Sequence, residues 1–259
     1  MDVQPLSPFG VRVTDLQVGP LPQAVADQLA QLLGTHGVLV ISGQHEVDDT
    51  AFVGFLASFG ELTFTQGETP VLGFPDLNVV SNVGRMTPPR SSFHVDTSYV
   101  RRPPAYTALR AVQVPEQGGQ TIFSDQYTAF DTLSPVLREL LQDKTIRHVV
   151  TGVEPGPGEE READHPVLRE HPLTGRTSLY LDAPGRCASI SGLPQDESDA
   201  LVAELLTHST REDNLYRHAW SPGDVVMWDN GCVLHRADHD GVVGDRVMHR
   251  GMSLGYASR

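Results

Sequence analysis

Residues 221–255 read SPGDVVMWDNGCVLHRADHDGVVGDRVMHRGMSLG, and they combine short apolar runs with turns rich in glycine and aspartate. A Gly-Asp turn precedes the apolar run 225–228, and a second run at 232–234 leads directly to His235. The run 246–250, Arg-Val-Met-His-Arg, has the pattern of a further strand. Short runs bounded by turn residues are typical of antiparallel sheet. The segment therefore predicts short strands that present histidine and arginine side chains.

The same pattern extends towards the N-terminus. Short runs rich in valine, isoleucine, leucine and aromatic residues alternate with turn residues, which predicts an antiparallel sandwich or barrel. Leucine and alanine at helical spacing predict helices that pack outside the sheets, and the acidic, glycine-rich stretch 152–164 predicts a mobile loop of the kind that forms lids. With no repeat or linker, residues 1–259 are expected to form a single domain. The predicted strands are 37–42, 77–80, 106–114, 121–124 and 178–181, and the predicted helices are 21–33, 48–59, 125–142 and 196–208.

Composition limits the partners and the compartment. The 259 residues include 19 Lys and Arg against 33 Asp and Glu, a net charge of −14 with neutral histidines. A phosphate backbone would bind against this field, so nucleic acid is not an expected partner. The chain has no apolar run of about 18 residues and no signal-peptide pattern, which predicts a cytoplasmic protein without a membrane partner. Cys187 and Cys232 have no CxxC partner, so neither a disulfide framework nor a zinc ribbon is expected.

The segment SSFHVDTSY, residues 91–99, holds the first candidate site. His94 and Asp96 lie two positions apart, so on a strand both project from one face and can bind one metal ion. His235 is the candidate third ligand. Two histidines and one carboxylate on one side of a metal leave the opposite positions open, which suits a non-heme Fe(II) oxygenase. An exposed polar strand end is the alternative reading of the His-x-Asp pair, and a zinc hydrolase is the alternative enzyme on the same three ligands.

Arg246 and Arg250 form the second candidate site. On a strand they share a face with Met248, and their Cα atoms would lie about 13 Å apart. That separation is too long for both to grip one small carboxylate, so the spacing predicts two different anions. A guanidinium suits bidentate capture of a carboxylate, so one arginine would bind a cosubstrate acid and the other the substrate. An exposed, salt-bridged strand is the alternative.

Together these residues resemble the TauD/TfdA family of Fe(II)- and 2-oxoglutarate-dependent dioxygenases. The resemblance covers nearly the whole chain. It implies a mostly β protein with flanking helices around a double-stranded β-helix, the jelly-roll or cupin-like core. It also implies that His94, Asp96 and His235 are the iron ligands. The segments that carry it are GVLVISGQ (37–44), FGEL (59–62), SSFHVDTSY (91–99), RRPPAYTALRAVQVPEQGGQTIFSD (101–125), HPLTGRTSLYLD (171–182), SPGDVVMWDN (221–230) and RVMHRG (246–251).

The resemblance further implies how the cosubstrates and the substrate bind. Fe(II), 2-oxoglutarate and O2 would oxidise the substrate, with release of succinate and CO2. The distal carboxylate of 2-oxoglutarate would be held by Arg246 and the hydroxyl of Thr121. Arg250 would bind the acidic group of the substrate, Tyr180 would place an aromatic ring against it, and Trp228 would form a wall near the iron.

The expected function is therefore that of an oxidoreductase acting on a small anionic molecule, a carboxylate, sulfonate or phosphonate. Asp96 favours hydroxylation or desaturation over halogenation, because related halogenases have a small residue there. The run 63–65, Thr-Phe-Thr, lacks the histidine that sulfonate-using relatives place there, which argues against taurine itself. The alternatives are a tailoring hydroxylase or desaturase of an amino acid or natural product, the zinc hydrolase, and a non-catalytic jelly-roll binding module. A homo-oligomer is expected from the resemblance.

Overall fold

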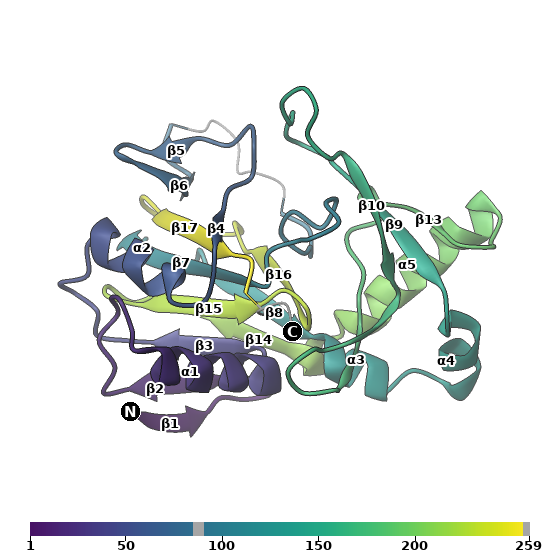
Figure 1. Ribbon diagram of the computed structural model, residues 1–259, viewed down its shortest axis with the longest axis horizontal. Helices are drawn as coiled ribbons and strands as arrows, with labels where there is room; N and C mark the ends of the chain where they lie inside the picture. The colour runs from purple at the N-terminus through teal and green to yellow at the C-terminus, as the bar shows by residue number, and fades with distance from the viewer. Residues whose placement is uncertain (85–90, 256–259) are drawn as a thin grey trace.

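The computed structural model describes residues 1–84 and 91–255. A large sheet with helices against it forms one side of the molecule, and a smaller lobe of sheet and helix forms the other (Figure 1). The large sheet has nine strands in the order β1-β2-β3-β15-β7-β17-β6-β5, with β4 paired to β17. It therefore combines strands from both ends of the chain. Its strands are β1 (Asp2–Pro5), β2 (Val11–Thr14), β3 (Val38–Ile41), β4 (Leu62–Thr63), β5 (Pro70–Val71), β6 (Phe74–Ser81), β7 (Tyr106–Gln113), β15 (Val225–Asp229) and β17 (Val247–Ser253).

A second sheet packs on one face of the large one. It has three strands in the order β14-β8-β16, which are Leu215–His218, Thr121–Asp125 and Val233–Ala237. Phe123 of this sheet shares a hydrophobic cluster with Val226 and Trp228 of the large sheet. Two sheets that face each other across a common core are a sandwich, as the short strands predict.

Helices cover the other face of the large sheet. Strands β3 and β15 are buried throughout, and their side chains alternate between the two faces. Leu39 and Met227 belong to the cluster that includes buried residues of α1 (Gln23–His36) and α2 (Asp49–Ala57), whereas Val40 and Trp228 belong to the cluster shared with the second sheet. The large sheet is therefore the middle layer, which explains why these two strands read as unbroken apolar runs.

The smaller lobe is built from the middle of the chain. A separate hydrophobic cluster, the third in the molecule, joins the short strands of this lobe to the helices before and after them. The sheets are β10-β9-β13 and β11-β12. The elements are α3 (Gln126–Asp131), α4 (Pro135–Leu141), β9 (Thr145–Val149), β10 (Glu162–Pro166), β11 (Leu168–Glu170), β12 (Thr177–Leu179), β13 (Cys187–Ile190), α5 (Gln195–Ser209) and a 3-10 turn (Glu212–Asn214).

The structure corrects three predicted elements. The helix predicted over 125–142 is two helices, because Pro135 cannot continue a helix and Ser134 caps a new one through Leu137 N–H. The loop predicted over 152–164 ends earlier, since β10 pairs with β9 from Glu162 onwards and buries alternate residues. Strand β2 runs parallel to β3, in contrast to the antiparallel pattern elsewhere in the large sheet. Among the described residues, no helix combines the length and apolar character needed to cross a membrane.

The smaller lobe contains a buried histidine whose protonation should control acid stability. His148 is 0% exposed, and neither of its ring nitrogens has a hydrogen-bond partner in the described structure. Burial, and then the neighbouring His165, lowers its pKa from 6.5 to about 3. Between these pH values His148 therefore binds a proton in the unfolded chain but not in the folded chain. Stability is accordingly expected to fall as the pH drops below 6.5.

Replacing His148 with leucine should remove this sensitivity. Between pH 8 and pH 5 the free energy of unfolding of the wild type should fall by about 2 kcal/mol more than that of the variant, which has no group to protonate there. Urea unfolding of both proteins at the two pH values measures the difference, and any change in packing cancels in the comparison. An equal pH dependence in the two proteins would show that His148 is not the acid-sensitive group.

Candidate active site

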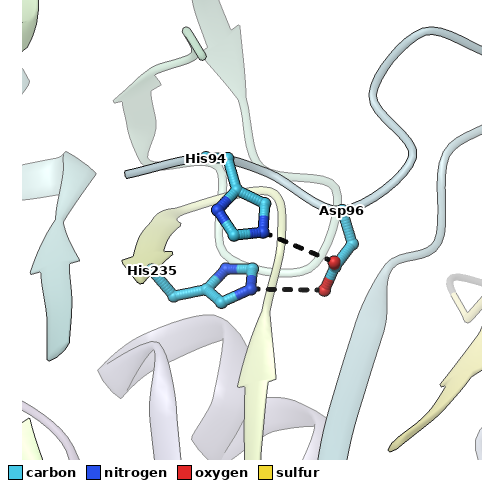
Figure 2. Close-up of side chains that lie close together, drawn as sticks. All are labelled: His94, Asp96 and His235. Atoms are coloured by element: carbon cyan, nitrogen blue, oxygen red, sulfur yellow. Dashed lines mark ion pairs between the residues drawn. The ribbon is translucent and has the colours of Figure 1, made fainter. Parts of the chain in front are cut away.

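Backbone pairing brings His94 and His235 together. The two residues form an antiparallel bridge in which each N–H donates to the other's carbonyl, at 3.0 and 3.1 Å. His235 lies on β16, which is held in register by β8. The centroids of the two imidazole rings are 4.2 Å apart. Both rings face the carboxylate of Asp96, as Figure 2 shows.

The three side chains lie close enough together to hold one metal ion. The Nε2 atoms of His94 and His235 lie 3.8 and 3.5 Å from the two carboxylate oxygens of Asp96, and ligand atoms of all three residues lie within 4.8 Å of one another. Nδ1 of His94 donates to the Ser92 carbonyl at 2.8 Å, which leaves Nε2 with a free lone pair. Burial, and next His94, lowers the pKa of His235 well below its ordinary value, so this ring is neutral as a ligand must be.

Asp96 is held as a carboxylate by two donors. Its Oδ2 accepts from the Thr107 hydroxyl and its Oδ1 from Nη1 of Arg250, both at 2.8 Å. Burial alone would raise the pKa of Asp96, but the charge of Arg250 is the largest of the causes that oppose it, and together they lower that pKa far below the ordinary value. The hydroxyl of Thr107 accepts in turn from Asn230 Nδ2 at 2.9 Å, so its proton is directed at Asp96. Two imidazoles and one carboxylate that converge in this way fit the Fe(II) set expected from the sequence.

A further buried carboxylate holds the turn that carries His94 and Asp96. Oδ2 of Asp182 accepts from the Ser98 hydroxyl at 2.8 Å and from Val95 N–H at 3.4 Å. Asp182 is 0% exposed. Sequence reasoning missed Asp182, Thr107 and Asn230 as parts of the site. All three lie in segments that carry the family resemblance, but only the fold shows what they contact.

Arg246 is a buried cation without a counter-charge. It is 1% exposed, and no carboxylate lies within ion-pair distance of it in the described parts of the chain. Its Nε donates to the Gly119 carbonyl at 2.8 Å and its Nη2 to the Thr121 hydroxyl at 3.3 Å. Burial lowers its pKa to about 10. A guanidinium in this state is stabilised by any anion that enters beside it.

The Thr121 hydroxyl accepts hydrogen bonds from two neighbouring side chains. Its Oγ1 accepts from Arg246 and also from Nε1 of Trp220, at 3.1 Å. Because a hydroxyl has one proton and both contacts use its lone pairs, the proton is free to donate to a ligand. Thr121 and Arg246 both line a cavity of about 400 Å³. Gly119 allows this packing, since a Cβ there would lie 3.0 Å from Cδ of Arg246. The sequence did not indicate the role of Trp220.

The same cavity reaches the metal-ligand set and Arg250. Its walls include His94, His235, Trp228 and Arg250. The centroids of the Trp228 and His235 rings lie 4.5 Å apart, so the indole packs against one of the candidate ligands. The structure therefore brings the two predicted arginines to one cavity, with one beside Asp96 and the other beside Thr121.

Two predicted contacts differ from expectation. Arg250 does not present a free guanidinium: Nη1 bonds Asp96, Nε bonds Oδ1 of Asn78 at 3.0 Å, and Nη2 forms an ion pair with the carboxylate of Glu68. Tyr180 is 2% exposed and packs against the rings of His148 and His165 in the smaller lobe. It is absent from the walls of the 400 Å³ cavity, because that lobe's core covers it. The position of Tyr180 therefore does not support a contact with the substrate.

A second group of potential ligands is explained by hydrogen bonding. His171, Asp229 and Cys232 are all buried and close together. Leu173 N–H donates to Nδ1 of His171, which leaves Nε2–H to donate to Asp229 at 2.9 Å. The group is thus a buried imidazole–carboxylate pair that ties the smaller lobe to β15.

Comparison with known proteins agrees with this geometry. The model of the taurine catabolism dioxygenase TauD, TfdA family matches residues 2–252. The alpha-ketoglutarate-dependent 2,4-dichlorophenoxyacetate dioxygenase of Cupriavidus pinatubonensis is 30% identical over 97% of this chain and 96% of its own. An alpha-ketoglutarate-dependent sulfate ester dioxygenase of Pseudomonas putida is 28% identical over 96% of this chain and 88% of its own.

Solved structures give the same result. A taurine dioxygenase from Burkholderia xenovorans superposes with a TM-score of 0.83 at 30% identity, over 98% of this chain and 91% of that one. This likeness confirms the expected mostly β, jelly-roll core. The chain therefore belongs to the TauD, TfdA family and is a 2-oxoglutarate-dependent dioxygenase.

Proposed function

We propose that this dioxygenase hydroxylates a small organic acid and that His94, Asp96 and His235 hold its Fe(II). The observation that carries the proposal is Arg246, a buried guanidinium with no carboxylate partner among the described residues, in the wall of a cavity that His94 and His235 also line. Enzymes of this family use Fe(II), 2-oxoglutarate and O2. The bound iron supplies the oxidising chemistry, in which 2-oxoglutarate becomes succinate and CO2.

The residues around the iron ligands set their orientation. Thr107 and Arg250 hold the Asp96 carboxylate from two sides, and Ser92 fixes the tautomer of His94. Such partners of metal ligands restrict the ligands to one arrangement and leave open positions for cosubstrate and O2. Trp228 walls the cavity beside His235 and excludes water from it.

Arg246, Thr121 and Trp220 form the proposed site for the distal carboxylate of 2-oxoglutarate. Arg246 supplies the charge, and the Thr121 hydroxyl supplies a donated hydrogen bond because Trp220 and Arg246 occupy its lone pairs. A zinc hydrolase on the same ligands would leave this buried cation without a role. A binding module would have no need of three converging metal ligands.

Replacing Trp220 with phenylalanine tests this arrangement. The variant removes the indole N–H, so the Thr121 hydroxyl loses one fixed contact and is free to rotate away from the ligand. We expect the KM for 2-oxoglutarate to rise about fivefold, the cost of one hydrogen bond, with kcat nearly unchanged. Succinate release measured against 2-oxoglutarate concentration gives both values. An unchanged KM, or a fall in kcat alone, would contradict the positioning role.

The substrate proposal rests on charge. The relatives reported above are named for a phenoxyacetate, a sulfate ester and taurine, which all carry an acidic group. The cavity offers Arg250 beside the metal ligands for such a group. An amino acid or natural product with a carboxylate satisfies the same chemistry, so a tailoring oxygenase is the second candidate. We also propose that the whole chain acts as one domain, because the large sheet contains both β1 and β17.

Anaerobic titration of the apoprotein with Fe(II) and then 2-oxoglutarate tests the proposed class. A weak visible charge-transfer band in the wild type, absent from His94→Ala, would support it. Screening organic acids for coupled succinate release would then identify the substrate class. Iron binding without the band would show that 2-oxoglutarate does not reach the metal. That result would favour the alternative functions, a zinc hydrolase or a non-catalytic binding module.

A further inference from the structure

Glu68 occupies the position on Arg250 that an anionic substrate would need. Its carboxylate pairs with Nη2 of Arg250, while the other two guanidinium nitrogens bond Asn78 and Asp96. Both Glu68 and Arg250 line the 400 Å³ cavity. The side chain of Arg250 is only 11% exposed, so an incoming acid has little access to it while Glu68 stays in place.

The charges around the cavity also oppose the binding of a further anion while Glu68 stays in place. Among the described residues, the Asp, Glu and Arg side chains that line the cavity or bond directly to Arg250 in its wall are Asp96, Glu68, Arg246 and Arg250, and the charges of these four cancel. Fe(II) and the dianion of 2-oxoglutarate cancel as well. An additional anion would therefore enter a neutral site, unless one of the carboxylates leaves. Asp96 is a proposed metal ligand, so Glu68 is the one that can leave.

Glu68 and Arg250 differ in how firmly they are held. Arg250 lies on β17, and its strand partner in β6 is Asn78, the residue that also accepts its Nε–H. Glu68 lies in a turn between β4 and β5, where its N–H donates to the Thr65 carbonyl at 3.3 Å. Its side chain is 25% exposed, so solvent is available to receive it. A carboxylate carried by a turn can move away from a cation that a strand holds still.

We propose that Glu68 is a specificity-determining residue, a displaceable carboxylate that reserves Arg250 until the acidic group of the substrate replaces it. The inference rests on the proposed function and adds what the substrate must bring. The substrate has to carry an anionic group able to compete with a carboxylate already in place. A neutral molecule leaves the Glu68–Arg250 pair intact and gains nothing from the arginine.

Replacing Glu68 with glutamine tests the proposal by binding. The protein is loaded with Mn(II) and N-oxalylglycine, an unreactive analogue of 2-oxoglutarate, and titrated calorimetrically with 2,4-dichlorophenoxyacetate, its neutral methyl ester, and taurine. Glu68→Gln should bind 2,4-dichlorophenoxyacetate and taurine, the two probes that carry an anionic group, about tenfold or more tightly than the wild type, because no carboxylate has to be displaced from Arg250. The ester should show no gain. Glu204→Gln, which removes one exposed carboxylate from α5, controls for net charge and should behave as the wild type.

The other outcomes overturn the proposal and separate it from the proposed function. Equal affinities of the wild type and Glu68→Gln for 2,4-dichlorophenoxyacetate, or no binding by Glu68→Gln, would show that Glu68 does not reserve Arg250. Weaker taurine binding by Glu68→Gln would show instead that Glu68 binds the ammonium group. Failure of N-oxalylglycine itself to bind any of the proteins would count against the dioxygenase site, whatever Glu68 does.

Discussion

Replacing Asp96 with alanine is expected to lower the affinity for Fe(II) by at least about 100-fold and to abolish turnover. Removing a residue that only hydrogen-bonds a metal ligand lowers metal affinity by about 10- to 100-fold, and removing the ligand itself should cost more. Asp96 is the only carboxylate in the group of three ligands. Its removal leaves two neutral imidazoles with no charge to offset that of the metal. It also leaves Arg250 facing the metal position without the carboxylate that now accepts from it at 2.8 Å.

Metal content and Fe(II) affinity measured on the purified variant check this result, with circular dichroism as the test of folding. Asp229→Asn is the matched control, because Asp229 belongs to the second described group of potential ligands. That variant should keep stoichiometric Fe(II). Retained iron in Asp96→Ala together with lost iron in Asp229→Asn would move the metal to the His171 group.

Replacing Arg246 with alanine should raise the KM for 2-oxoglutarate by roughly 100-fold, or about 3 kcal/mol, the cost of removing one partner from a buried charge pair. Arg246 is 1% exposed and donates to Thr121 beside the cavity. Without it the distal carboxylate would be desolvated and paired with a hydroxyl alone. Fe(II) binding should be unaffected, because Arg246 contacts none of the three ligands in the described structure.

Lysine at the same position provides a graded comparison. Arg246→Lys keeps a charge but loses the planar, two-pronged donor, so its KM should lie between those of the wild type and the alanine variant. Succinate formation against 2-oxoglutarate concentration gives the three values. Equal KM values in all three proteins would reject Arg246 as the cosubstrate arginine and would leave its burial unexplained.

Much of the layered fold was predictable because it depends on local periodicity. The apolar runs of β3 and β15 are strands buried on both faces, and alternate residues point to the helices or to the second sheet. Apolar spacing alone did not show that the predicted helix over 125–142 divides. The second helix begins at Pro135, with Ser134 as its N-cap, and neither residue changes the apolar spacing. Strand β1 was also missed, because its four residues are mostly exposed and carry little apolar signal.

The candidate site divides in the same way. His94 and Asp96 were predicted as a pair on one strand, and Arg246 and Arg250 as sharing a face of another. In the structure His94 forms a single bridge, Asp96 lies in a turn, and Arg246 directly precedes β17. The partners that tune them come from distant segments: Thr107 on Asp96, Trp220 on Thr121, and Glu68 on Arg250. Tyr180 shows the converse, since a residue in a matching motif packs into the core of the smaller lobe.

By itself, the sequence determined which chemical groups are present and how they are spaced along the chain, and its apolar runs indicated the strands. It thereby determined the strand-rich class, the His-x-Asp pair and the two arginines. Only the tertiary structure decided that His235 bridges to His94, that Arg246 is buried with no carboxylate partner among residues 1–84 and 91–255, and that Glu68 holds Arg250. These features depend on strand pairing and on the burial of charge, and both are set by contacts between segments far apart in the chain.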